Sequence, residues 1–324
     1  MSATRLSIAL NQGLVNFDGA KVAVWGARAG QDLAGVPTEA LFVSAFRPDY
    51  DALAAAGRRV KTTVSETLDA AIVFVPREKA LARAMVAEAA RLSRGPVVVD
   101  GAKTHGIEAI LRKLRSCHDV SQVISKAHGK LGVVAPGADL AAWADPGPRQ
   151  VAEGFLTRLG VFSADGADPG SRLLVDHLPQ LLGARVADLG AGWGYLSRAV
   201  LTRRGVAALD LVEADLVALD CAKLNVEDAR AQFHWADATR FGAPNSYDTI
   251  VTNPPFHTAR AANPSLGQSF LDAAARLLRP KGQLWLVANR QLPYERTLAG
   301  AFKDVAEMGG DRTYKIVRAA RLRT

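Results

Sequence analysis

The stretch "RVADLGAGWGYLSRAVL" (185–201) decides the fold. A short apolar run leads into a loop with glycines at 190, 192 and 194, and an amphipathic helix is predicted to begin near Tyr195. Glycines permit turns with positive φ and allow a ligand to lie against the backbone. In open α/β sheets, such a turn at the carboxyl end of the first strand binds nucleoside cofactors. The stretch therefore predicts an α/β domain with a cofactor loop.

The same plan occurs a second time in the chain. "KVAVWGARAG" (21–30) matches "RVADLGAGWG" (185–194), and "DAAIVFVPRE" (69–78) matches "YDTIVTNPPF" (247–256). A helical stretch and a further apolar run follow in both halves. Strands that alternate with helices indicate βαβ units and a parallel sheet, so we expect two tandem Rossmann-like domains.

The stretch between the two halves is rich in proline, glycine and aspartate, as expected of a linker (136–150). We therefore expect one domain over residues 1–150 and a second over 151–324. Most of the candidate site residues of the second half are replaced by other residue types in the first half. By sequence alignment, Asp188, Gly192, Asn253, Pro255 and Phe256 correspond to Val24, Arg28, Val75, Arg77 and Glu78, and Pro254 corresponds to Pro76. The first half is therefore interpreted as a degenerate copy that kept the fold and lost the site.

Composition and charge restrict the class of protein. The formal charge is +8, and both halves are mildly basic, which makes a polyanionic partner plausible. The two cysteines, Cys117 and Cys221, show no paired or metal-type spacing, so we expect neither a disulfide framework nor a metal site. No apolar run has the length of a spanning helix, and the N-terminus lacks a signal peptide. These features predict a cytoplasmic protein without a membrane partner.

Three acidic residues of the second half are candidates for cofactor contacts. Asp188 precedes the glycine loop, where a carboxylate suits a cofactor with a cationic centre and would repel a pyrophosphate. This favours S-adenosyl-L-methionine over a dinucleotide. Glu213 stands where an acid accepts hydrogen bonds from ribose hydroxyls, although Asp210 or Asp215 can be mistaken for it. Asp237 is a candidate for the adenine amino group, or else a turn-forming aspartate.

The candidate catalytic residues lie in "TNPPFH" (252–257), directly after an apolar run. Its two adjacent prolines fix φ and lack N–H groups, so they end the strand. The side-chain carbonyl of Asn253 and the main-chain carbonyl of Pro254 can accept both N–H groups of a planar exocyclic amine and so aim its lone pair. Phe256 can stack on the heterocycle, once the base has left its own stack. His257 is either a proton acceptor or a residue that packs in the loop.

With these residues in place, the chain resembles the bacterial ribosomal RNA small-subunit methyltransferase C family over almost its whole length. That family consists of guanine-N2 methyltransferases with two class I methyltransferase-like domains, of which the C-terminal one is catalytic. The motifs that carry the resemblance are "GVFSADGADPGSRLLVDHLP" (160–179), "VADLGAGWGYLS" (186–197), "YDTIVTNPPFH" (247–257), "GQLWLVANRQLPYE" (282–295) and "YKIVRA" (314–319).

The resemblance implies a seven-stranded, mostly parallel sheet with one antiparallel strand in the second domain, and RNA recognition by the first. It implies cofactor contacts at Asp188, Gly190, Gly192, Glu213 and Asp237, and target-base contacts at Asn253, Pro254 and Phe256; Asn253 is also placed with the cofactor contacts.

The expected function is transfer of a methyl group from S-adenosyl-L-methionine to the N2 amine of a guanine in ribosomal RNA of the small (16S) subunit. A monomer that acts on ribosomal RNA or on the small ribosomal subunit is expected. Other planar amines stay open: a guanine of the large subunit, adenine N6, or a protein glutamine. A non-catalytic RNA-binding assembly factor is the alternative from a different class.

Overall fold

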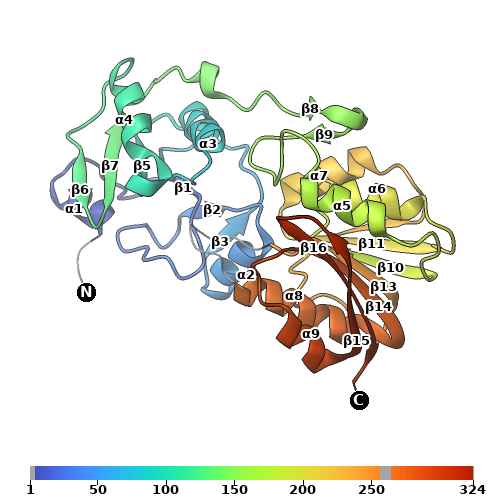
Figure 1. Ribbon diagram of the computed structural model, residues 1–324. Coiled ribbons are helices and arrows are strands. Elements are labelled where there is room, and N and C mark those ends of the chain that lie inside the picture. The colour runs from blue at the N-terminus through green and yellow to red at the C-terminus, as the bar shows by residue number, and fades with distance from the viewer. Residues whose placement is uncertain (1–3, 256–263, 324) are drawn as a thin grey trace. The chain divides into compact units, whose positions relative to one another are not determined.

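The computed structural model describes residues 4–255 and 264–323 (Figure 1). The chain divides into two compact units, Met1–Gly147 (unit 1) and Pro148–Thr324 (unit 2). Within the described residues, each unit is built around a seven-stranded sheet.

Unit 1 has the strand order β3-β2-β1-β4-β5-β7-β6. All neighbouring strands pair in parallel except β7, which runs antiparallel to β5 and β6. Its strands are β1 (Val22–Trp25), β2 (Leu41–Val43), β3 (Arg59–Lys61), β4 (Ala70–Phe74), β5 (Val97–Ala102), β6 (Ile124–Lys126) and β7 (Gly129–Val134). Its helices are α1 (Arg5–Asn11), α2 (Arg47–Ala55), α3 (Lys79–Leu92) and α4 (Ile107–Arg115), with short 3₁₀ turns η1 (Lys103–His105) and η2 (Ala141–Trp143).

Unit 2 repeats this order as β12-β11-β10-β13-β14-β16-β15, and β16 runs antiparallel to β14 and β15. Its strands are β10 (Arg185–Leu189), β11 (Ala208–Glu213), β12 (Ala231–Trp235), β13 (Tyr247–Thr252), β14 (Leu278–Asn289), β15 (Phe302–Gly310) and β16 (Tyr314–Leu322). Its helices are α5 (Pro169–His177), α6 (Tyr195–Leu201), α7 (Leu216–Asn225), α8 (Pro264–Leu277) and α9 (Glu295–Ala301). A two-stranded ribbon of β8 (Arg149–Gln150) and β9 (Leu156–Thr157), joined by the turn η3 (Ala152–Gly154), precedes them.

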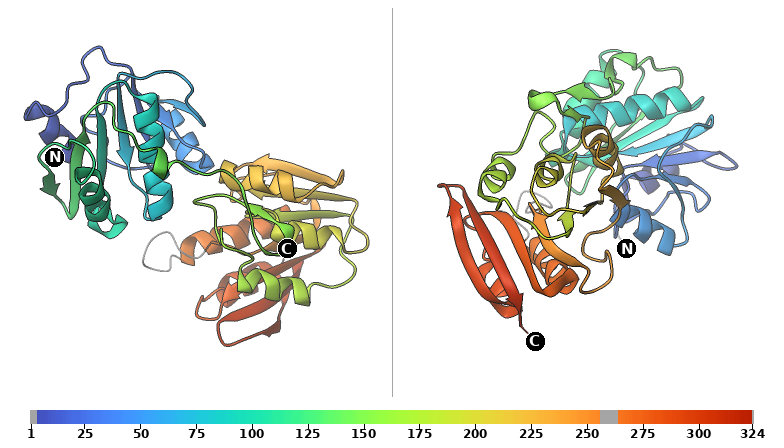
Figure 2. Two further views of the ribbon diagram at one scale, coloured as in Figure 1. Left: turned by 90° about the horizontal axis from the view of Figure 1, so that it is seen from above. Right: turned by 90° about the vertical axis from the view of Figure 1, so that its right-hand side faces the viewer.

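Helices cover both faces of the unit 2 sheet. Since successive side chains of a strand point to opposite faces, each strand contributes to both of the resulting cores. From β10, Ala187 and Leu189 pack in a core that includes α8 and α9, whereas Val186 packs in a core that includes α5, α6 and α7. Asp188 lies on the same face as Val186. The long β15–β16 hairpin forms one edge of this sheet (Figure 2). The prediction of two tandem Rossmann-like folds is thus confirmed, including the mostly parallel sheet with one antiparallel strand.

The strand register corrects the sequence alignment of the two halves by one residue. Val24 pairs with Ile72 in unit 1, whereas Asp188 pairs with Val251 in unit 2. If Val24 and Asp188 are equivalent, then Ile72 corresponds to Val251 and not to Ile250. Sequence alone did not reveal the slip, because both residues of each apolar pair are buried. The corrected counterparts of Asn253, Pro254, Pro255 and Phe256 are Phe74, Val75, Pro76 and Arg77.

The same reasoning finds the counterpart of Glu213. Ala23 pairs with Leu41, and its equivalent Ala187 pairs with Asp210. Leu41 therefore corresponds to Asp210, and Ser44 stands in unit 1 where unit 2 has Glu213.

Candidate active site

The glycine loop of unit 2 begins where β10 ends. The amides of Gly190 and Ala191 both donate to the carbonyl of Val212, so the loop turns over the end of the neighbouring strand β11. Gly192 has a φ of 55°, and a Cβ there would meet nothing within 4 Å. The backbone at Gly192 therefore needs the left-handed conformation and borders open space, as a loop that holds a ligand requires.

Asp188 is a buried acid behind this loop, and only one of its two carboxylate oxygens has a hydrogen-bond partner among the described residues. Its side chain has no exposed surface, and Oδ2 accepts a hydrogen bond of 2.7 Å from Ser197 Oγ on α6. Its Oδ1 is buried without a hydrogen-bond partner among the described residues. Burial raises the pKa of Asp188 to about 7, the Ser197 hydrogen bond opposes this, and the nearby Glu213 charge adds to it. A cationic hydrogen-bond donor would satisfy the orphaned oxygen.

Glu213 is the acid at the end of β11 that contacts the glycine loop. Its Oε2 accepts from the amide of Gly192 at 2.7 Å, and its Oε1 accepts from the amide of Asp215 at 2.8 Å. The pKa of Glu213 is raised to about 6, because the effect of burial outweighs that of these backbone hydrogen bonds, which lower the pKa.

The two other acids considered for that role have different partners. Asp210 is buried within the sheet, where its oxygens lie 2.6 Å from His234 Nε2 and 2.8 Å from the hydroxyl of Tyr247. Asp215 caps α7 by accepting from the amide of Val217. Of the three, the structure brings Glu213 to the loop.

Asp237 follows the carboxyl end of β12. Its Oδ1 accepts from the amide of Thr239 at 2.9 Å and from the Thr239 hydroxyl at 2.7 Å. This is the turn geometry that the sequence offered as the alternative. The adenine contact remains a prediction that depends on the second oxygen of this carboxylate.

Asn253 lies beside the glycine loop because β13 and β10 end together. Thr252 pairs with Leu189, and the Thr252 hydroxyl donates to the Leu189 carbonyl at 2.7 Å. The Asn253 amide nitrogen then donates to Asp168 Oδ2 and to Ser171 Oγ, both at 2.9 Å. Pro254 is buried at the strand end. Phe256 and His257, also named from the sequence, lie outside the described residues.

One pocket of about 40 Å³ brings the loop and the amide together. Gly190, Gly192 and Asn253 are the sequence-predicted residues that line it, while Asp188 and Glu213 lie behind the loop. Asp237 and Pro254 are not among its described lining residues. The other lining residues are Phe162, Ser163, Asp168, Ser171, Ala191, Trp193, Tyr195 and Leu196.

The segment before α5 supplies three of the lining residues that sequence reasoning missed, Phe162, Ser163 and Asp168. Trp193 Nε1 donates to the carbonyl of Phe162 at 2.9 Å, and the rings of Phe155, Trp193 and Tyr195 cluster with centroids 5.0–5.8 Å apart. These contacts fasten the segment over the glycine loop. Its available signals were aromatic residues on both sides of the loop and the helix-capping Asp168.

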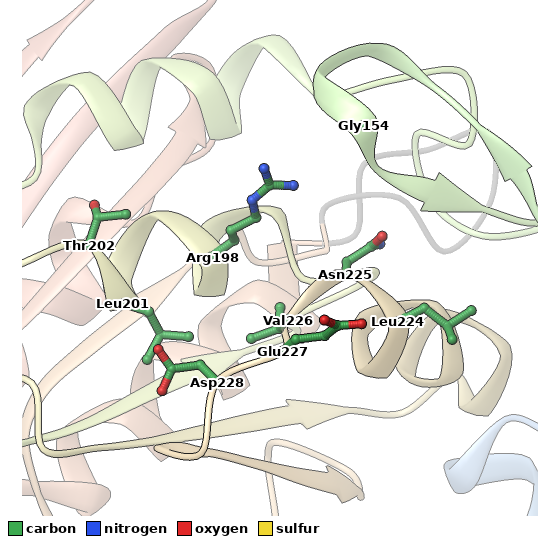
Figure 3. Close-up of a pocket in the computed structure, with 9 residues that line it drawn as sticks. All are labelled: Gly154, Arg198, Leu201, Thr202, Leu224, Asn225, Val226, Glu227 and Asp228. Atoms are coloured by element: carbon green, nitrogen blue, oxygen red, sulfur yellow. The ribbon is translucent and has the colours of Figure 1, made fainter.

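A wider groove of about 500 Å³ lies elsewhere in unit 2 (Figure 3). Its lining comes from η3, α6 and the end of α7 with the loop that follows, and includes Arg198, Thr202 and Asp228. None of the sequence-predicted site residues is among its described lining. The groove is therefore separate from the candidate site.

Two further properties concern only residues 4–255 and 264–323. No helix there is both long and apolar enough to cross a membrane. Nor do three or more His, Cys, Asp or Glu side chains gather there as a group that could hold a metal ion.

Comparison with known proteins identifies the family. Residues 153–318, about half of the chain, match the family model "Methyltransferase small domain". The ribosomal RNA small subunit methyltransferase C of Shewanella loihica is 31% identical over 265 residues, which cover 78% of this chain and 77% of that protein. The chain belongs to the ribosomal RNA small subunit methyltransferase C family. The family resemblance drawn from the sequence motifs is thus confirmed.

Further members agree with this assignment. The Shewanella piezotolerans protein of the same name is 30% identical over 263 residues, with 78% of this chain and 77% of that protein covered. A solved structure, the T. thermophilus 16S rRNA N2 G1207 methyltransferase in complex with AdoMet and guanosine, matches with a TM-score of 0.78 at 23% identity. The match covers 98% of this chain and 92% of that one, so the two-unit fold is shared.

Proposed function

We propose that this chain transfers a methyl group from S-adenosyl-L-methionine to the N2 amine of a guanine in 16S ribosomal RNA. The observation that carries the proposal is that the glycine loop and Asn253 line the same pocket. It combines a place for a nucleoside cofactor with a hydrogen-bonding amide suited to a planar amine. The names of the relatives, and the guanosine and AdoMet in the T. thermophilus complex, support the same substrate and cofactor.

The residues of unit 2 fit this cofactor. Its methyl group is bonded to a positively charged sulfur and is therefore electrophilic. Asp188 Oδ1 is a buried acceptor that needs a donor, which the cofactor's amino group would supply. The space above Gly192 admits a ligand against the backbone, and Glu213 can accept hydrogen bonds from ribose hydroxyls. Asp237 is assigned to the adenine amino group.

Asn253 and Pro254 are assigned to the reacting amine. The lone pair of an exocyclic amine is delocalised into its ring, so the free amine is a poor nucleophile. Carbonyl oxygens that accept both N–H groups return the lone pair to nitrogen and aim it at the methyl group. The amine nitrogen would form a bond to the methyl carbon as the bond from that carbon to sulfur breaks, which leaves a neutral thioether, and the nitrogen would then lose a proton to solvent. Phe256 is assigned to stack on the guanine.

Unit 1 is proposed to bind RNA. Residues 1–150 carry 19 basic and 14 acidic side chains. Arg77, Lys79 and Lys103 are exposed on the segments that follow β4 and β5, where they can contact phosphates. We propose that one unit of the chain is catalytic and the other binds RNA, and that the chain acts as a monomer.

The test uses small ribosomal subunits, large ribosomal subunits and naked 16S RNA as separate substrates, all from cells that lack the corresponding methyltransferase. The purified chain is incubated with methyl-labelled S-adenosyl-L-methionine, and the RNA is digested to nucleosides. We expect label in N2-methylguanosine of the 16S RNA, with one methyl group per RNA molecule. Label in N6-methyladenosine, in large-subunit RNA or in a protein would redirect the proposal to that substrate, and no label in any of these would refute it.

A further inference from the structure

We propose that Asp168 and Ser171 are positioning residues that fix the side-chain amide of Asn253, so that its carbonyl oxygen is presented to the reacting amine. The inference rests on the proposed function, because that function assigns Asn253 to the amine. It starts from two hydrogen bonds: Asn253 Nδ2 lies 2.9 Å from Asp168 Oδ2 and 2.9 Å from Ser171 Oγ.

These two bonds determine which end of the amide is free. A side-chain amide has two N–H donors on nitrogen and one acceptor oxygen. Asp168 and Ser171 take one donor each. An ionised carboxylate can only accept, so turning the amide over would set Asn253 Oδ1 against Asp168 Oδ2 without a hydrogen between them. Among the residues that the structure describes, the oxygen of Asn253 is consequently the part of the amide left to a ligand.

Both positioning residues are themselves held rigidly. Asp168 caps α5, and its Oδ2 also accepts from the amide of Ser171 at 2.9 Å. Asp168 and Ser171 are 8% and 7% exposed, so neither moves freely in solvent. Asn253 is thus held at its backbone by the sheet, through the neighbouring Thr252, and at its side chain by the start of α5.

Gly170 lies beside the carboxylate of Asp168, where there is little room for a side chain. A Cβ there would lie 3.0 Å from Asp168 Oδ2 and 3.0 Å from the ring of Tyr314 on β16. The glycine therefore lets the first turn of α5 pack tightly between the carboxylate and this strand.

Fixing the amide matters for the reaction, because a turned amide would offer N–H groups to the amine. The amine nitrogen must keep its lone pair for the methyl group, so it needs acceptors and not donors. Loss of the positioning residues should therefore lower kcat, because the amine is misaligned in the reaction step. The KM for RNA and the affinity for the cofactor should change little.

The experiment compares Asp168→Ser, Asp168→Asn and Ser171→Ala in the full chain with small-subunit RNA. Serine is a good helix cap but is too short to reach Asn253, so α5 should form while kcat falls about tenfold to hundredfold. Asparagine keeps an acceptor oxygen and should give a kcat between that of Asp168→Ser and that of the wild type. Ser171→Ala removes one neutral partner, and kcat should fall about threefold to tenfold.

Asp228→Ser is the matched control. Like Asp168, Asp228 accepts hydrogen bonds from a nearby backbone amide and from a side chain; both groups belong to Arg230. Asp228 does not line the candidate site. Its kcat should equal that of the wild type. A wild-type kcat in Asp168→Ser would overturn the inference. So would a loss of kcat that follows a matching loss of cofactor affinity or melting temperature, since the pair would then only support the fold.

A second measurement needs no RNA. The side-chain NH₂ signals of Asn253 are assigned in ¹⁵N-labelled protein by their absence in Asn253→Ala. They should exchange slowly with solvent in the wild type and clearly faster in Asp168→Ser. Fast exchange in the wild type would overturn the inference. Slow exchange in a wild-type chain that methylates no RNA would instead refute the proposed function and leave the positioning of the amide intact.

Discussion

The two units share one strand order, but their carboxyl edges differ in what occupies them. In unit 2, Gly192 borders open space and its amide meets Glu213. In unit 1, the counterpart of Gly192 is Arg28, whose Nη1 lies 3.0 Å from Asp49 Oδ2. Asp49 Oδ1 also accepts from the amide of Ala29 at 2.8 Å. The unit 1 loop therefore carries an arginine in an ion pair where the unit 2 loop has a glycine beside open space.

The amine end of the site shows the same contrast. Val75, the counterpart of Pro254, has its carbonyl 3.0 Å from His105 Nδ1. Phe74 stands where unit 2 has Asn253, so the amide is absent. At these two positions, unit 1 therefore lacks the amide and has a carbonyl that already contacts a histidine.

The comparison teaches that this framework does not by itself make a methyltransferase site. The sheet and its covering helices need only buried apolar residues, which both units have. The proposed activity would need groups such as Asp188 Oδ1, which has no hydrogen-bond partner among the described residues.

The largest effect is expected from Asn253→Ala, which removes the amide that unit 1 also lacks. Transfer should fall about 10²–10³-fold, because the amine loses an oriented acceptor in the transition state. Cofactor affinity should stay close to that of the wild type. Single-turnover transfer of labelled methyl groups and calorimetric titration measure the two quantities. Normal turnover would remove Asn253 from the mechanism.

Glu213→Ser introduces the residue that unit 1 has at this place. Affinity for S-adenosyl-L-methionine should fall about tenfold to hundredfold, because hydrogen bonds to a charged acceptor are lost. Equilibrium dialysis checks this, with Asp220→Ser as the control for an exposed acid on the following helix. Equal affinities in the two variants would contradict the ribose assignment.

The pH dependence of cofactor binding tests Asp188. Its pKa is about 7, chiefly because of burial, so the carboxyl is largely protonated below that pH. A cationic amino group binds the ionised form, and affinity should therefore rise by up to about tenfold per pH unit as pH increases toward 7. Dissociation constants are measured from about pH 5.5 to 7.5, below the range where an α-amino group loses its own proton.

The variant Asp188→Asn provides the control for this titration. Its affinity should be weaker, and the step near pH 7 should disappear. Only the titration of Glu213, whose pKa is about 6, should remain. A pH profile identical to that of the wild type would show that Asp188 does not control binding.

The smallest effect is expected in unit 1. Arg28→Ala should lower the free energy of unfolding by less than about 1 kcal/mol, because its side chain is 61% exposed and solvent screens the pair. Asp49→Ala should cost more, since the amide of Ala29 then loses its acceptor as well. Urea unfolding compares the two. A larger loss for Arg28→Ala would mean that the ion pair is a main support of this unit.

Much of the fold could be predicted from the sequence, because its signals are local. The glycine loop after 185–189 and the apolar runs near 70–74 and 247–252 mark strands that the structure also has. The register between strands could not be predicted, since a run such as Ile250-Val251 is buried on both faces and fits either alignment. Only the pairing of Asp188 with Val251 resolves the one-residue slip.

Candidate site residues could be chosen from the sequence where the residue type and its position indicate a chemical role. Contacts between residues that are distant in sequence could not be predicted. Asp188, Gly192, Glu213 and Asn253 were chosen by type and position, and the structure brings them to one loop. Asp168 caps α5, a role that depends on residues close in sequence. Its second role depends on a contact across 85 residues of sequence, which no local pattern encodes.

The measurement that tests the account most directly is the number of cofactors bound per chain. Equilibrium dialysis with labelled S-adenosyl-L-methionine should give one per wild-type chain, bound in unit 2. Gly192→Arg carries the unit 1 residue into the second loop, and this variant, if its circular dichroism shows it folded, should bind none. Two cofactors on the wild type, or one remaining on Gly192→Arg, would contradict the claim that unit 2 alone holds the site.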